Sequence, residues 1–79
     1  MKKLLITGLK PSATEAEIHA WMSNFGSVQT VELIREGNSN TPLAVVHMKI
    51  SDKHSLLLTS LISNYWHDGA MVTAHLLTH

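Results

Sequence analysis

The segment Thr41–Ile50, with the sequence TPLAVVHMKI, most strongly limits what this chain can fold into. Its residues fit the period of two of a β-strand, with apolar side chains on both faces. One face holds Ala44, Val46, Met48 and Ile50, and the other holds Leu43, Val45, His47 and Lys49. A strand of this kind needs cover on both faces. If helices cover only one face, the other is an exposed aliphatic surface, and such surfaces usually mark binding sites.

Alternation of apolar and polar residues predicts three more strands, over Lys3–Thr7, Val28–Arg35 and Met71–Leu77. The segment Glu36–Asn40 is rich in turn-forming residues and joins the second and third strands as a hairpin loop. The pair Asp68-Gly69 predicts a tight turn just before the last strand.

Two helices are predicted between these strands. Thr14 and Glu17 form a capping box, in which the Thr14 hydroxyl accepts from a first-turn amide and the Glu17 carboxylate reaches back to the amide of Thr14. Gly26 is expected to end this helix with a left-handed cap, and Ser51 or Asp52 caps the second helix. The predicted core-facing stripes are Ile18, Trp21, Met22 and Phe25 in the first helix and Leu57, Leu58, Leu61 and Ile62 in the second, the latter broadened by Leu56 and Tyr65.

The order strand, helix, strand, strand, helix, strand predicts an α+β fold. With right-handed crossovers it gives a ferredoxin-like βαββαβ sandwich, in which a four-stranded antiparallel sheet carries both helices on one face. One domain over residues 1–79 is expected. The first and third strands occupy the centre of the sheet, which places Leu5 beside Val45. Trp66 is assigned to the core, with exposure at the sheet edge as the alternative.

Composition narrows the range of functions. Six basic and six acidic residues give no net charge, so the long-range attraction to phosphate is missing at pH 7. Six histidines make the chain cationic below about pH 6.5, so affinity for an anion should rise on acidification. The absence of cysteine excludes a thiolate metal site, and the apolar run Leu4–Ile6 is too short to span a membrane. We therefore expect a soluble, cytoplasmic protein without a cofactor.

Several motifs resemble the RNA recognition motif (RRM) domain family. Gly8-Leu9-Lys10-Pro11, Thr14–Ile18 and Phe25-Gly26-Ser27-Val28 are similar to the opening half of such a domain. Leu61–Asn64 and Asp68–Val72 are similar to its close, with Ala70 where the family usually has arginine. The resemblance covers essentially the whole chain. It implies that single-stranded RNA lies across the bare sheet face, with bases stacked on aromatic residues of the two central strands.

The stacking positions of the family motifs carry aliphatic residues in this chain. The hexamer motif falls on Leu4–Leu9 and the octamer motif on Thr41–Met48, where only Ala44 and Val46 fit the pattern. Leu5, Leu43 and Val45 stand where the family has exposed aromatic residues. Because base stacking is worth ~1–3 kcal/mol per base, the three replacements predict weak RNA binding.

Two functions therefore stay open for the bare sheet face. One is weak binding of single-stranded RNA, and the other is a protein-protein or homodimer interface made by the aliphatic residues. A small domain that simply tolerates exposed aliphatic side chains is a third interpretation. The predicted site residues, which share this face with Thr30 and Glu32, are Lys3, Leu5, Thr7, Ile34, Leu43, Val45, His47, Lys49, Met71, Thr73 and His75. No catalytic or metal site is expected, because no histidine is paired with a second ligand at a suitable spacing.

Overall fold

The computed structural model describes residues 2–35, 37 and 41–77. Apart from Gly37, the predicted hairpin loop Glu36–Asn40 lies outside the described residues. The elements in chain order are β1 (Lys2–Thr7), α1 (Glu15–Met22), β2 (Ser27–Ile34), β3 (Leu43–Lys49), α2 (Asp52–Leu61), β4 (Tyr65–His67) and β5 (Ala70–Leu77).

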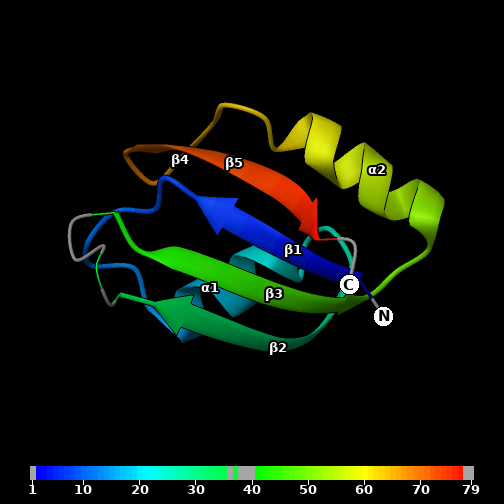
Figure 1. Ribbon diagram of the computed structural model, residues 1–79, viewed down its shortest axis with the longest axis horizontal. Helices are drawn as coiled ribbons and strands as arrows, with labels where there is room; N and C mark the ends of the chain where they lie inside the picture. The colour runs from blue at the N-terminus through cyan, green and yellow to red at the C-terminus, as the bar shows by residue number, and fades with distance from the viewer. Residues whose placement is uncertain (1, 36, 38–40, 78–79) are drawn as a thin grey trace.

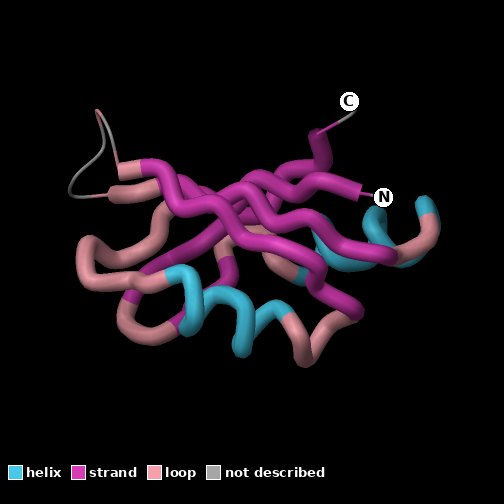
Figure 2. The backbone as a smooth tube through the Cα atoms, turned by 90° about the horizontal axis from the view of Figure 1, so that it is seen from below, coloured by secondary structure: helices cyan, strands magenta, loops and turns pink. Residues whose placement is uncertain are grey.

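The strands form one antiparallel sheet in the order β2-β3-β1-β5-β4, and both helices pack on the same face of it (Figures 1 and 2). The central pair is β3 and β1, and Leu5 lies opposite Val45 as predicted. The ferredoxin-like fold is therefore confirmed. The sheet has five strands rather than four, because the short segment Tyr65–His67 pairs with the start of β5.

The core lies between the inner face of the sheet and the two helices. From the central strands, the fully buried side chains are Leu4, Ile6, Ala44, Val46 and Met48. They meet Ile18 and Met22 of α1 and Leu58 and Ile62 near the end of α2. Burial of these aliphatic groups is the main driving force of the fold, and it fixes which face of the sheet stays open.

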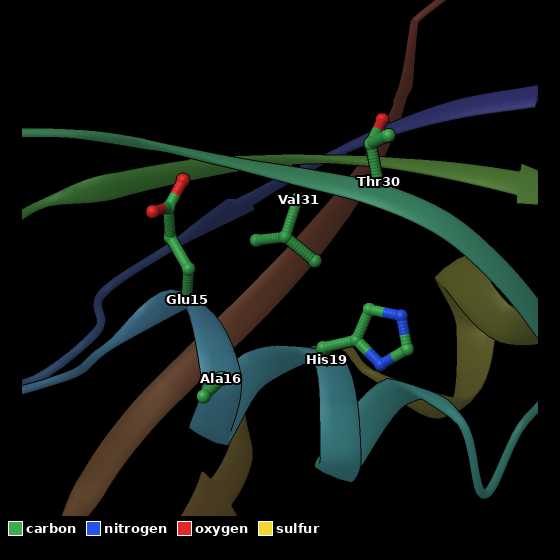
Figure 3. A pocket seen from close by; sticks show the side chains of 5 residues that line it. All are labelled: Glu15, Ala16, His19, Thr30 and Val31. Atoms are coloured by element: carbon green, nitrogen blue, oxygen red, sulfur yellow. The ribbon is translucent and has the colours of Figure 1, made fainter.

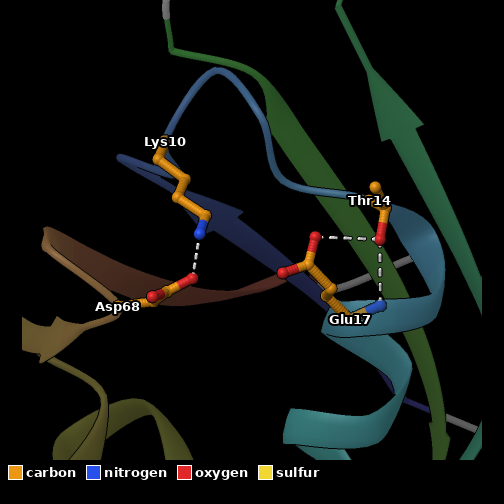
Figure 4. Close-up of polar contacts among 4 residues, drawn as sticks. All are labelled: Lys10, Thr14, Glu17 and Asp68. Carbon is orange, nitrogen blue, oxygen red and sulfur yellow. Dashed lines mark hydrogen bonds and ion pairs between the residues drawn. The ribbon is translucent and has the colours of Figure 1, made fainter.

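Helix α1 begins as predicted but ends earlier. The Thr14 hydroxyl oxygen accepts a hydrogen bond from the Glu17 N–H at 3.2 Å, while the Glu17 carboxylate accepts from the Thr14 hydroxyl at 3.0 Å rather than from the Thr14 amide (Figure 4). The helix ends at Met22, and Gly26 does not have a positive φ, so the predicted left-handed cap is wrong. A Cβ at Gly26 would lie 2.8 Å from Cγ2 of Ile50, so close packing explains the glycine.

Helix α2 buries a different stripe from the predicted one. Ser51 is its N-cap and accepts from the His54 N–H at 3.1 Å, as expected. Leu58 and Ile62 are buried as predicted, but Leu57 and Leu61 are 62% and 54% exposed, and Leu56 is exposed too. The third buried position is Ser55, whose hydroxyl donates to the Asp52 carbonyl at 2.7 Å. A small side chain whose hydrogen bond is made within its own helix can be buried at little cost. Because the side of α2 that carries Ser55 faces the core, Leu57 and Leu61 face the solvent.

Candidate nucleic-acid interface

The register of the sheet brings all of the predicted site residues onto its outer face. Lys3 lies opposite His47, Leu5 opposite Val45 and His75, and Thr7 opposite Thr73. Directly paired residues point to the same side of a sheet, and the residues between them point to the other side. Because Leu4 and Ile6 point into the core, the partners named above share the outer face. By the same alternation along β2, β3 and β5, the outer face also contains Ile34, Leu43, Lys49 and Met71.

The centre of this outer face is aliphatic. Leu5, Leu43 and Val45 are half-buried by their neighbours in the sheet, and Ile34, opposite Leu43, is 39% exposed. The positions that carry stacking aromatics in the family motifs are thus accessible on the open face but offer no ring. A ligand would meet a smooth apolar surface here.

One end of the outer face is basic. Lys3, His47 and Lys49 gather where β1 begins and β3 ends, and Glu32 contacts His47 with 3.2 Å between Oε1 and Nε2. Lys2 instead pairs with Asp52 and Lys10 with Asp68. Within the described ranges, neither Lys3 nor Lys49 has an ion-pair partner. These two lysines are consequently available to an anionic ligand.

The two surface ion pairs lie outside this basic end, and they shift the pKa values of Asp52, Asp68 and Lys10. The hydrogen bond from Lys2 and its charge lower the pKa of Asp52. In the same way, the hydrogen bond and charge of Lys10 lower the pKa of Asp68, while Asp68 raises the pKa of Lys10. The Lys10–Asp68 pair thus stabilises the ionised form of both of its partners.

The opposite end of the outer face carries Trp66, which the sequence prediction placed in the core. In the β4–β5 hairpin, Trp66 lies opposite Met71, next to the pair Tyr65 and Val72. Val72 is fully buried, so Met71 and Trp66 point to the outer face, and they are 51% and 65% exposed. The core assignment of Trp66 is wrong, and its alternative, exposure at the sheet edge, is correct, because Trp66 pairs with the exposed Met71 in the edge strand β4.

A signal for this hairpin is present in the sequence. Asp68 and Gly69 have φ values of 50° and 82°, as in a two-residue type I′ turn, for which Asp-Gly is a favoured pair. Such a turn pairs the residues on either side of it, His67 with Ala70 and Trp66 with Met71. Treating the turn as a hairpin connection, rather than only as the start of the last strand, would have placed Trp66 outside.

Two of the predicted site residues use their hydroxyl groups within the fold. The Thr7 hydroxyl donates to the Thr73 carbonyl at 3.4 Å, and the Asn64 N–H donates to the Thr73 hydroxyl oxygen at 3.2 Å. Thr73 therefore ties β5 to the segment that follows α2. Its hydroxyl oxygen accepts this bond, so its O–H group is left to donate to a ligand.

A shallow hollow of about 350 Å³ lies between α1 and the edge strand β2 (Figure 3). It is lined by Glu15, Ala16, His19, Thr30 and Val31. Among the described residues, no group of three or more histidine, cysteine, aspartate or glutamate side chains is arranged to hold a metal ion. No helix in the described part of the chain is long and apolar enough to cross a membrane.

These observations define a class of domain: a split βαβ sandwich with two helices on one sheet face and an open second face. The chain belongs to the RNA recognition motif family, whose model matches residues 4–53. No curated protein matches the chain in sequence.

Solved structures share the fold at low sequence identity. Pes4 RRM3 superimposes with a TM-score of 0.83 at 18% identity, covering 100% of this chain and 94% of that chain. The Rna15 RRM with bound RNA (GU) superimposes with a TM-score of 0.71 at 15% identity, covering 96% of this chain and 83% of that chain. RNA recognition domains 1 and 2 of Sex-lethal from Drosophila melanogaster superimpose with a TM-score of 0.75 at 16% identity, covering 94% of this chain and 48% of that chain.

Proposed function

We propose that this domain binds single-stranded RNA weakly, on the outer face of its sheet. The observation that carries the proposal is the open face itself, which neither helix covers and which joins a basic end to an apolar surface. Membership of the RNA recognition motif family supports it. The similarity to the Rna15 RRM, a structure with bound RNA, adds support at the level of the fold.

The expected affinity is low for two reasons. Leu5, Leu43 and Val45 replace stacking residues, each worth ~1–3 kcal/mol per base in proteins that have them. The chain also has no net charge, so attraction to the phosphate backbone at this face depends on local charges, those of Lys3, Lys49 and the histidines. Dissociation constants on the order of 10⁻⁶–10⁻⁴ M, the range of sequence-independent binding, follow from this.

The test is a titration of the ¹⁵N-labelled protein with a pool of short single-stranded RNAs at pH 6 and low salt. We expect amide shifts along β1 and β3, and weaker binding by Lys3→Glu. Lys53→Glu is the matched control, because Lys53 is exposed on α2, away from the outer face. Unchanged spectra at millimolar RNA would refute the proposal, and so would equal losses in both lysine variants.

A second candidate function is docking of another protein or a second copy of the chain. It is favoured by the aliphatic cluster of Leu5, Leu43 and Val45 with the exposed Ile34 beside it. Sedimentation over a dilution series tests self-association, and Leu43→Asp should abolish any complex that forms. A monomer that captures no partner through this cluster rules the candidate out. The cytoplasmic location stays a prediction.

A further inference from the structure

We infer that Trp66 is the base-stacking platform of this domain, on which an unpaired base of single-stranded RNA lies. The inference rests on the proposed function and says where the stacking energy comes from, since the three positions of the family motifs lack a ring. Within the described ranges, Trp66 is the one tryptophan, tyrosine or phenylalanine side chain on the outer face, and it is 65% exposed. An indole that remains so exposed is available to stack on a base.

The hairpin that carries Trp66 is held from its inner side. The His67 and Trp21 rings stack with 3.9 Å between their centroids and 13° between their planes. Tyr65 stacks on the same Trp21 at 6.0 Å and 23°. Tyr65 and His67 thus attach β4 to α1, while Trp66 between them points the other way.

The turn of the hairpin is attached as well. Lys10, in the connection after β1, forms an ion pair with Asp68 (Figure 4). With the strand and its turn both held, the backbone beneath Trp66 is positioned before any ligand arrives. A preorganised ring loses less conformational entropy on binding than one on a free loop.

The Trp66–Met71 pair continues the outer face rather than forming a separate patch. The Gly8 backbone, directly after β1, packs against the Met71 carbonyl so closely that a Cβ at Gly8 would lie 2.2 Å from that oxygen. Thr7 and Thr73 pair beside this contact. The platform therefore lies beyond the end of β1 opposite to Lys3, about 20 Å away along the strand direction, because Met71 and Trp66 are level with the position six residues after Lys3. An RNA strand is the ligand that fits this layout, because it offers a flat base and spaced phosphates along one chain.

The experiment measures RNA affinity and the Trp66 indole N–H resonance in the full chain, using the same pooled RNAs. We expect Trp66→Ala to weaken binding roughly 5- to 150-fold, the loss of one stacked base, and Trp66→Phe to retain most of the affinity. Leu57→Ala is the matched control, since Leu57 is 62% exposed on α2, and it should bind as the wild type does. In the wild type, RNA should shift the Trp66 indole N–H.

Failure of the inference and failure of the proposed function give different results. If the wild type binds RNA and Lys3→Glu weakens it, but Trp66→Ala binds as tightly as the wild type, Trp66 is not the platform and RNA binding stands. If no RNA causes any amide or indole shift, the proposed RNA binding and the inference about Trp66 are both refuted. If the indole N–H moves on changing protein concentration alone, a second copy covers Trp66 and the inference is overturned. Should Trp66→Ala not fold, a stationary wild-type indole N–H beside shifted β1 amides would overturn it equally.

Discussion

The inner and outer faces of the two central strands differ sharply although they share one backbone. The inner apolar side chains of β1 and β3 have no exposed surface and form the core of the domain: Leu4, Ile6, Ala44, Val46 and Met48. The outer side chains are half-buried or exposed, and they lack the aromatic residues of the family motifs. The difference shows that one strand can keep its packing residues while its ligand-facing residues change.

This separation has a physical cause. An inner residue touches both helices or their neighbours, so a change of volume is felt throughout a close-packed core. An outer residue touches only the adjacent strands and solvent, so its identity is set by the ligand rather than by the fold. The family assignment therefore establishes the fold, whereas ligand affinity depends on what now occupies the outer face.

The largest expected effect is a loss of stability, and it compares an inner with an outer residue of the same strand, β1. Ile6→Ala should lower the free energy of unfolding by about 2–5 kcal/mol, because it leaves a cavity at a fully buried site. Leu5→Ala, one residue earlier on the outer face, should cost less than about 1.5 kcal/mol. Urea unfolding followed by circular dichroism compares the two. Equal losses would mean that the outer face is also covered in the folded protein.

Gly8 lies outside the core, yet we expect its substitution to destabilise the fold as much as that of an inner residue. Its φ is +86°, and a Cβ would meet the Met71 carbonyl oxygen, which is backbone and cannot rotate away. Gly8→Ala should therefore destabilise the fold by about 2–4 kcal/mol, although Gly8 lies at the end of β1 outside the core. Gly37→Ala is the comparison, because Gly37 also has a positive φ but nothing within 4 Å of its Cβ. A Gly8 variant no less stable than the Gly37 variant would contradict the close contact.

The sequence was sufficient to predict the inner face and most of the outer one. Alternation in Lys3–Thr7 and Thr41–Ile50 assigned residues to faces correctly, because a strand has only two sides and the apolar set needs burial. The same logic fails in α2, where leucines occupy almost the whole circumference. Which of them are buried depends on which side of the helix the rest of the fold covers, and that side includes Ser55, which no local pattern predicts.

Trp66 illustrates a second limit. A large aromatic residue in a small domain is usually buried, so a core position was the reasonable expectation. Its exposure follows from pairing with Met71, and that pairing depends on the hairpin turn at Asp68-Gly69. The ring stack of His67 on Trp21 joins residues far apart in the chain, and no local pattern predicts it.

A smaller effect concerns charge on the outer face. Glu32 contacts His47 beside Lys3, so its carboxylate opposes the approach of phosphate at the basic end. Glu32→Gln should strengthen RNA binding about two- to fivefold at low salt, with the gain shrinking as salt screens the charge. Fluorescence anisotropy at two salt concentrations measures this. Glu15→Gln, at the start of α1 near the sheet edge, should leave RNA affinity unchanged, and an equal gain there would indicate a net-charge effect instead.

The smallest effect tests how the hairpin that extends the outer face is held. Lys10 lowers the pKa of Asp68 below its ordinary value of 3.8 in the folded protein, so the pair contributes stability above that pH and loses it as the pH falls through the lowered pKa. Asp68→Asn removes this contribution while tolerating the positive φ of the turn. The variant should melt at a slightly lower temperature than the wild type at pH 6, and the gap should close toward pH 2. Because the pair lies at the surface, the gap should also narrow in high salt. A gap that stays constant down to pH 2 would show that the turn conformation, and not the charge on Asp68, holds β4 in place.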